Sequence, residues 1–286
     1  MIVAEGLLFR YPSADKPAIA DLSFRIAEGE VFGFLGPSGA GKSTTQKILL
    51  RLLRGWQGQI EILGRRLEDW NSDYYRHVGV GFEAPNHYSK LTARENLRYF
   101  ASLYRDVPRT FEPLLTSVGL GPHADQRVAT FSKGMKHRLN LIRALIHRPR
   151  LLFLDEPTAG LDPVHARMVR DLIEAQRQDQ VTVFLTTHDM QLAEELCDRV
   201  GFLVDGKLWA VDAPAALRAA HGRRAVEVKA SDGRRGHFSL DDLGDNGAFI
   251  DFLRSARVET IHSMESSLED VFIKVTGREL TGDESS

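Results

Sequence analysis

Cysteine is nearly absent from this sequence, in which Cys197 is the single one among 286 residues. One thiol cannot form a disulfide bond within the chain, and it cannot build a zinc site from several cysteines. Chains without disulfide bonds are typical of reducing compartments, so we expect the protein to be cytosolic.

Long hydrophobic runs and a strong charge imbalance are also missing. No run approaches the roughly 18 apolar residues of a membrane-spanning helix. Residues 1–16 lack the basic and apolar segments of a secretory signal peptide. The 37 basic and 39 acidic residues give a formal net charge of -2, which does not favour broad nucleic-acid binding. Any role at a membrane must therefore come through a membrane-embedded partner.

Four short apolar runs have the composition of buried parallel strands. They are VFGFL, VGVGF, LLFL and VTVFL, at residues 31–35, 78–82, 151–154 and 181–185. Helical patterns alternate with them at residues 42–54, 92–105 and 162–178. Residues 2–11 and 20–30, before the first run, indicate antiparallel strands. This alternation of strands and helices predicts an α/β domain with a mainly parallel sheet.

Two of these helices carry start signals. Thr92 and Glu95 have the spacing of a capping box, and Asp162 stands before Pro163 as an N-cap stands before a first-turn proline. A Ser at Ser132 indicates a third helix start in the stretch FSKGMKHRLN.

Residues 222–276 have a different character and predict a small α+β domain. Residues 225–230 and 234–240 indicate a hairpin around an Asp-Gly turn. A helix over 246–256, a strand over 257–264 and a final helix capped by Ser266 with Glu269 follow. We expect residues 277–286 to form a flexible tail.

The stretch GPSGAGKST follows the first apolar run and opens a helical pattern, which is the context that a phosphate-binding P-loop requires. Its glycines allow the backbone to wrap a phosphate, and the N–H groups at the helix start favour a negative charge. Lys42 supplies a cation to the β- and γ-phosphates, and the Ser43 hydroxyl can ligate Mg²⁺. The residues of this stretch are Gly36, Pro37, Ser38, Gly39, Ala40, Gly41, Lys42, Ser43 and Thr44.

Ionisable side chains follow two of the other apolar runs. LLFLDEP ends with Asp155 and Glu156, and VTVFLTTHD carries His188. The carboxyl ends of parallel strands meet along the sheet edge where ligands bind. We therefore expect Asp155 to hold the Mg²⁺ shell and Glu156 to accept a proton from an attacking water. His188 is expected to contact the γ-phosphate and position that water.

Together with FSKGM, these motifs resemble the nucleotide-binding subunit of ABC transporters over residues 1–215. GPSGAGKST is similar to the Walker A loop and LLFLDEP to Walker B, while His188 matches the switch histidine. FSKGM resembles the signature loop usually written LSGGQ, and AGLD, ending at Asp162, resembles the D-loop. The resemblance implies a P-loop NTPase core with a mainly parallel sheet, an antiparallel β-subdomain and a helical signature subdomain.

The same resemblance implies that ATP is the ligand. Tyr11, in YPSADKPAI, would stack on the adenine, and Ser132, Gly134 and Asp162 would complete the nucleotide site. For Tyr11 the alternative is a buried aromatic residue of a β-strand.

Two departures from the family pattern concern the glutamine loop and the signature loop. Glu83 stands where the family has glutamine, and a carboxylate can meet Mg²⁺ directly or through water. Glu83 is therefore a candidate metal ligand, like Ser43 and Asp155. Lys133 and Met135 replace a glycine and a glutamine of the signature loop.

These departures and the final SLEDVFIKVTGREL resemble the ATPases of ABC-2-type exporters, which include drug and antibiotic exporters. Residues 222–276 are similar to the accessory domain of that branch. The resemblance implies a peripheral protein on the cytoplasmic face of the cell membrane, bound to a multispanning permease that carries the substrate specificity.

The chain has one P-loop and one signature loop, so a sandwich of two ATP molecules needs a second ATP-binding subunit. A homodimer with C₂ symmetry is the simplest arrangement. ATP binding would close it and hydrolysis would open it, and residues 83–100 would transmit the motion to the permease. The aromatic and apolar side chains of that segment fit the core of its own helix equally well.

Other functions remain open at this point. The exported substrate can be a drug or antibiotic, or instead a lipid, a polysaccharide or an ion. A soluble ABC-type ATPase acting on nucleic acid is a different class, but zinc cysteines, a long coiled-coil insertion and a second cassette are missing from the sequence. We expect no nucleic-acid partner, and Glu83 and the C-terminal domain disfavour an importer subunit.

Overall fold

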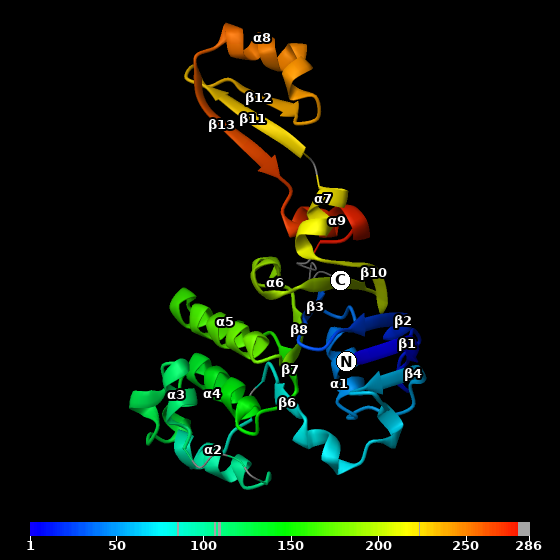
Figure 1. Cartoon of the computed structure of the whole chain (residues 1–286), viewed down its shortest axis with the longest axis vertical. Helices are drawn as coiled ribbons and strands as arrows, with labels where there is room; N and C mark the ends of the chain where they lie inside the picture. Colours follow the sequence, from blue (N-terminus) through cyan, green and yellow to red (C-terminus); the bar gives the residue numbers. More distant parts are fainter. Residues whose placement is uncertain (85, 106, 108–109, 223, 280–286) are drawn as a thin grey trace. The chain divides into compact units, whose positions relative to one another are not determined.

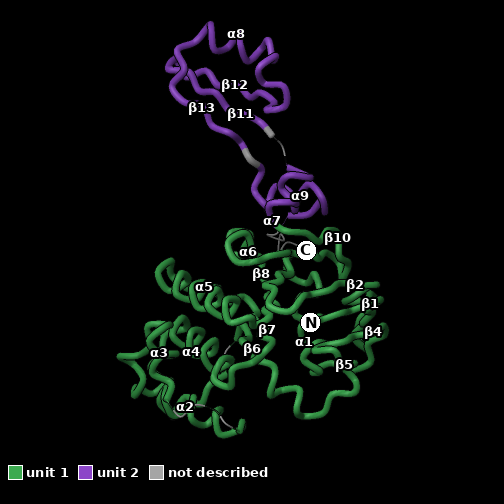
Figure 2. The backbone as a smooth tube through the Cα atoms, viewed as in Figure 1, with its two compact units in different colours: residues 1–213, 280–286 green, residues 214–279 purple. Residues whose placement is uncertain are grey.

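The computed structural model describes residues 1–84, 86–105, 107, 110–222 and 224–279. Within them the chain forms two compact units, Met1–Ala213 and Pro214–Glu279 (Figure 2). The sequence places these boundaries at 215 and 222. The second unit begins earlier because helix α7 (Pro214–His221) packs against helix α9 (Leu268–Thr276). Residues 280–286, most of the predicted tail, lie outside the described residues.

A six-stranded sheet forms the centre of the first unit (Figure 1). Its strand order is β10-β9-β3-β8-β7-β6, and neighbours are parallel except β10 and β9. The strands are β3 (Val31–Leu35), β6 (Val78–Gly81), β7 (Leu151–Asp155), β8 (Thr182–Thr187), β9 (Arg199–Val204) and β10 (Lys207–Asp212). The four predicted parallel strands are confirmed. Every side chain of β3 and β8 is buried, which explains why these strands lack polar alternation.

An antiparallel sheet of order β2-β1-β4-β5 packs against the central sheet and confirms the predicted β-subdomain. Its strands are β1 (Ile2–Phe9), β2 (Ile19–Ile26), β4 (Gln57–Ile62) and β5 (Arg65–Arg66). The contact is aromatic: the ring of Phe24 in β2 lies 5.0 Å from Phe34 of β3 and 6.3 Å from Phe184 of β8. These rings support the strand that leads into the P-loop.

Six helices lie in the described part of the first unit, and three of them begin at the predicted caps. They are α1 (Lys42–Leu49), α2 (Ala93–Ala101), α3 (Glu112–Ser117), α4 (Lys133–Leu145), α5 (Pro163–Gln178) and α6 (Met190–Leu196), with 3₁₀ turns at Leu67–Asp69, Ser72–Arg76, Gly121–His123 and Val128–Thr130. Thr92 forms its capping box with Glu95, and Ser132 and Asp162 cap α4 and α5. Figure 1 shows α2, α3 and α4 gathered on the side of this unit away from β1 and β2.

The predicted length of α1 is wrong, because the helix ends at Leu49 instead of residue 54. Arg51 has a φ of 60°, which a right-handed helix cannot contain. Among the described residues, no helix has the length and apolar composition needed to cross a membrane.

The second unit is a three-stranded antiparallel sheet with three helices. The elements are α7, β11 (Arg224–Ala230), β12 (Arg235–Ser239), a 3₁₀ turn at Leu243–Asp245, α8 (Gly247–Ser255), β13 (Val258–Glu265) and α9, and the strand order is β12-β11-β13. The predicted hairpin, helix and strand are thus confirmed. Rings of Phe249 and Phe252 on α8 lie 5.3 and 5.7 Å from Phe238 of β12. This aromatic contact joins α8 to one face of the sheet.

The predicted cap of the final helix is wrong by one residue. Ser267 caps α9 in a capping box with Asp270, instead of the predicted Ser266 with Glu269, which has the same spacing. The observed choice is coupled to burial, because Leu268 at the first helical position is fully buried.

The approach of α4 to β6 provides a test of the fold. A Cβ atom on Gly79 would lie 2.2 Å from the backbone oxygen of Ala144, whereas one on Gly81 would lie 3.0 Å from a rotatable methyl group of Leu154. We expect Gly79→Ala to lower the unfolding free energy of the first unit by about 2–3 kcal/mol and Gly81→Ala by less, since overpacking against backbone cannot relax by rotation. Thermal unfolding followed by circular dichroism measures both, and equal losses would contradict the proposed α4–β6 contact.

Candidate functional site

The P-loop connects β3 to α1 through close backbone contacts. A Cβ atom on Gly36 would lie 2.0 Å from the oxygen of Leu203, so only glycine fits there. Gly41 has a φ of 107°, and a Cβ on it would lie 2.7 Å from the oxygen of Ala18. Gly36 and Gly41 are therefore required by the fold that shapes this loop.

Lys42 lies at the first position of α1 with its ammonium group inside the loop. Its Nζ atom donates to the carbonyl oxygens of Gly36 and Pro37 at 2.5 and 3.0 Å. Burial lowers the pKa of Lys42, and Glu156, Asp155 and Glu83 oppose this effect, in that order. The same lysine is thus close to the predicted proton acceptor and to two of the predicted metal ligands.

The ends of β7 and β8 place two carboxylates beside each other. Asp155 pairs with Thr186 across the two strands, and its Oδ1 atom accepts a hydrogen bond from the Thr186 hydroxyl at 2.5 Å. Glu156 follows with a φ of 48°, and its N–H donates to the Thr186 carbonyl at 2.9 Å. This turn directs the Glu156 side chain toward the residues after β8.

The Glu156 carboxylate accepts three hydrogen bonds from residues that follow one another in sequence. Its Oε1 atom accepts from the backbone N–H of His188 at 3.0 Å and from Nδ1 of the same residue at 2.7 Å. Its Oε2 atom accepts from the Thr187 hydroxyl at 2.9 Å. Glu156 is buried while the His188 side chain is 63% exposed, so the imidazole can meet a ligand on its outer side.

These groups line one pocket of about 460 Å³. Its lining consists of Ser38, Gly39, Ala40, Gly41, Lys42, Ser43, Thr44, Glu83, Asp155, Glu156 and His188. The P-loop helix, two fixed carboxylates and an exposed imidazole therefore face one space. Such an arrangement can bind a polyphosphate and activate a water beside it.

Tyr11 lies at the edge of this pocket. Its hydroxyl shares a hydrogen bond of 3.2 Å with the hydroxyl of Thr44, and its half-buried ring meets the edge of the Phe9 ring. The contact with Thr44 places the ring near the P-loop. Tyr11 follows the end of β1 and is half-buried, so the alternative of a buried strand residue is wrong, while stacking on adenine stays a prediction.

The signature and D-loop residues lie outside the pocket lining. Ser132 is exposed and accepts a hydrogen bond from the N–H of Met135 at 3.2 Å. Asp162 is exposed at the start of α5, and Leu161 before it lies against Gly134, where an added Cβ would be 3.2 Å from the leucine methyl. These two loops form a surface of their own, separate from the P-loop of the same chain.

The loop of Glu83 is attached to α4 by side chains that the sequence analysis does not identify. Asn140 donates to the Phe82 oxygen at 2.7 Å, Arg143 donates to the Asn86 oxygen at 2.6 Å, and His87 bonds the Lys136 oxygen at 2.9 Å. Their partners are about fifty residues away in sequence, and a single sequence carries no signal for such pairs.

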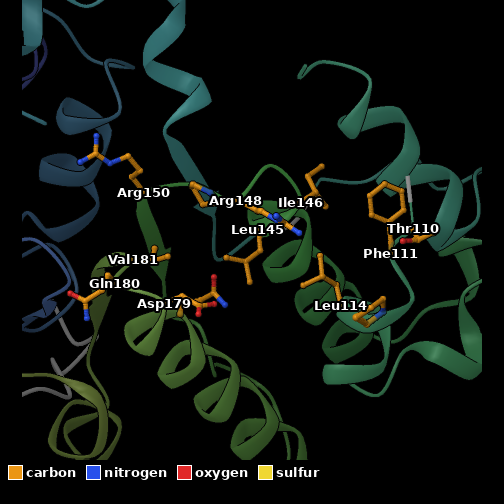
Figure 3. A pocket seen from close by; sticks show the side chains of 13 residues that line it. Thr110, Phe111, Leu114, Leu145, Ile146, Arg148, Arg150, Asp179, Gln180 and Val181 are labelled. Atoms are coloured by element: carbon orange, nitrogen blue, oxygen red, sulfur yellow. The ribbon is translucent and has the colours of Figure 1, made fainter. Parts of the chain in front are cut away.

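A larger cleft of about 720 Å³ lies at the amino ends of the central strands, opposite the P-loop pocket (Figure 3). Arg150 and Val181, which immediately precede β7 and β8, line it together with the ends of α4 and α5. Ligands of open parallel sheets bind at the carboxyl ends of the strands. The smaller pocket is therefore the candidate site, and the cleft of Figure 3 lies at the opposite ends of the same strands.

Comparisons with known proteins agree with this geometry. The family described as "ABC transporter" matches residues 19–159, and the family described as "Fluoroquinolone efflux ABC transporter C-terminal domain" matches residues 224–265. The chain is 52% identical to a fluoroquinolones export ATP-binding protein of Mycobacterium tuberculosis, over 98% of this chain and 95% of that protein. It is 34% identical to the bacitracin transport ATP-binding protein BcrA of Bacillus licheniformis, over 92% of this chain and 93% of that one.

Solved structures show the same fold. The ATP-binding subunit of an ABC transporter matches with a TM-score of 0.71 and 31% identity, over 77% of this chain and 92% of that chain. A dimeric ATP-binding cassette in a post-hydrolysis state, bound to ADP and Pi, matches with a TM-score of 0.66 and 26% identity, over 74% and 98%. With its P-loop, its buried glutamate and its sequence similarity along the whole chain, this protein belongs to the ATP-binding subunits of ABC transporters and is an ATPase.

Proposed function

We propose that this chain hydrolyses ATP to drive the export of a drug or antibiotic through a separate membrane permease. The observation that supports this cargo is similarity to exporter ATPases that spans both units, including the match of residues 224–265 to a fluoroquinolone efflux domain. The chain is also 37% identical, over 93% of its length, to a Nod factor export ATP-binding protein of Bradyrhizobium diazoefficiens. This similarity favours a second candidate, a cargo other than a drug.

In the proposed mechanism, Glu156 accepts a proton from the water that attacks the γ-phosphate. Its three donors hold the carboxylate in place, so the group needs no reorganisation before it acts. His188 orients toward the γ-phosphate, and Lys42 with the α1 N-terminus compensates the phosphate charge.

The pocket also fits a magnesium ion that protein side chains and the phosphates of the nucleotide would coordinate together. Ser43, Asp155 and Glu83 offer the hard oxygen atoms that Mg²⁺ prefers. Among the described residues, no three His, Cys, Asp or Glu side chains are gathered so as to hold a metal by themselves. Phosphate oxygens and water would complete the shell, and the ion would neutralise charge on the phosphates.

The active unit in this proposal is a homodimer. Ser132, Gly134 and Asp162 lie apart from the P-loop pocket of their own chain, so a second copy is needed to bring them to the γ-phosphate. Related cassettes have been solved as dimers. The N-cap of α4 would then present its helix N-terminus to the partner's nucleotide.

An aromatic groove beside the Glu83 loop is the proposed contact with the permease. Tyr75, Phe82, Tyr88, Phe100 and Tyr104 are among the residues that line its volume of about 560 Å³. Tyr88, Tyr99 and Leu103 are exposed, whereas Ala93 and Leu97 of α2 are buried. Residues 83–100 therefore supply both a helix core and an exposed apolar surface that fits a partner. This contact would hold the chain at the cytoplasmic face of the membrane.

Replacement of Glu156 by glutamine tests the proposed proton acceptor. We expect Glu156→Gln to lower the rate of phosphate release at least roughly 10²-fold, since an amide cannot accept the proton. Binding of a fluorescent ATP analogue should persist. Glu30→Gln removes a carboxylate of similar burial outside the pocket and serves as control. Undiminished phosphate release by Glu156→Gln would contradict this role.

Replacement of Ser132 by arginine tests the shared site. Ser132→Arg should abolish ATPase activity and still bind the ATP analogue, because its own P-loop pocket is intact. Mixing Ser132→Arg chains with Lys42→Ala chains should restore about a quarter of the wild-type rate. Random pairing makes half of the dimers hybrids, and each hybrid has one complete site of two. Loss of analogue binding by Ser132→Arg alone would show that Ser132 acts within its own chain.

Drug accumulation in cells tests the proposed cargo. Cells that carry the chain with its permease should retain less fluoroquinolone than cells carrying Lys42→Ala, because only the first can hydrolyse ATP. Intracellular drug fluorescence gives the measurement, and a membrane protein that co-purifies with both versions identifies the permease. Equal accumulation would exclude fluoroquinolone as the cargo.

A further inference from the structure

A buried histidine of the signature helix has an unused ring nitrogen. His137 on α4 is only 6% exposed, and its Nδ1 atom has no hydrogen-bond partner among the described residues. A polar atom that is removed from water without a partner is unfavourable, so a nearby acceptor or donor is expected.

The contacts of α4 place Glu83 next to this histidine. Asn140, three residues after His137 on the same face of the helix, donates to the oxygen of Phe82, the residue before Glu83. Lys136, the residue before His137, accepts through its backbone oxygen from His87, four residues after Glu83. Residues on both sides of Glu83 are therefore bonded to residues on both sides of His137.

Charge interactions agree with this placement. Burial lowers the pKa of His137, Glu83 opposes that effect, and Lys133 adds to it. Glu83 likewise opposes the lowered pKa of Lys42. One carboxylate is thus within electrostatic reach of both the P-loop lysine and the signature helix.

Glu83 differs from the two other acids of the pocket in its hydrogen bonding. Asp155 accepts from Thr186, and Glu156 accepts from Thr187 and His188. Glu83 is exposed and accepts no hydrogen bond from the part of the chain that the structure describes. A third carboxylate near a polyanionic ligand needs a cation or a donor to hold its charge.

We propose that His137 is a positioning residue for Glu83. Rotation of the exposed glutamate, together with a local shift of the atoms that cover Nδ1 of His137, lets the carboxylate accept a hydrogen bond from that nitrogen. This contact ties the signature helix to the acid of the nucleotide pocket. The proposal rests on the assignment of that pocket to ATP hydrolysis. It adds a contact between two segments that both depart from the usual family residues.

A spectroscopic experiment tests the contact without nucleotide. The full chain is labelled with ¹⁵N-histidine, and His137→Gln assigns the His137 side-chain resonances. We expect Glu83→Gln to shift those resonances and to leave His147 unmoved. His147 is a matched reporter, because its Nδ1 is also buried without a partner in the described part of the chain, and Glu83 is not among the groups that act on it. Unchanged His137 resonances, or equal shifts at both histidines, would overturn the proposal.

Kinetics separate a positioning role from a structural one. We expect Glu83→Gln and His137→Gln each to lower kcat by roughly three- to tenfold, with KM for ATP little changed, as for loss of one hydrogen bond to a charged group. The double variant should be no slower than the slower single variant. The proposal would be overturned if the kcat loss of the double variant equalled the product of the two single losses. It would also be overturned if the kcat loss of His137→Gln were fully explained by a lower melting temperature of that variant. If the wild-type chain does not hydrolyse ATP, the proposed function fails, while a resonance shift confined to His137 still supports the contact.

Discussion

The parallel pairing of β7 with β8 is the constraint on which the nucleotide site depends. It sets Asp155 opposite Thr186 and lets the N–H of Glu156 bond the Thr186 carbonyl. Glu156 then adopts a positive φ, which costs a residue other than glycine about 1–2 kcal/mol. Three hydrogen bonds from Thr187 and His188 offset that strain and hold the carboxylate in the pocket. The strained turn is thus part of the preorganisation of the site.

In the proposed homodimer, each chain by itself has an incomplete site. The P-loop and strand ends face one pocket, whereas Ser132 and Asp162 lie on a separate exposed surface. Two helix N-termini can hold one γ-phosphate only if they belong to different copies. In this proposal dimer closure depends on ATP, which links the proposed chemistry to the proposed movement of the permease.

The glutamate at position 83, where the family has glutamine, changes the charge balance of the pocket. The pocket contains three carboxylates and Lys42, and it receives a polyanion. Asp155 and Glu156 are fixed by neighbouring hydroxyl, imidazole and backbone donors, while Glu83 lies between the pocket and α4. Asn140 and His87 attach its loop to the helix that begins with the signature motif. In the proposed function, Glu83 and its loop would join the nucleotide pocket to the segment that would meet the permease.

Sequence alone determined the features that depend on neighbouring residues. The P-loop, the buried strands and the caps at Thr92, Ser132 and Asp162 follow from local patterns, because glycine freedom, burial and capping act over a few residues. The end of α1 and the cap of α9 needed the structure, since tertiary packing selects among locally equivalent choices. Only the tertiary structure decided that His188 binds Glu156 and that Asn140 holds the Phe82 carbonyl. Those partners are 32 and 58 residues apart, and only the pairing of β7 with β8 and the packing of α4 on β6 bring them together.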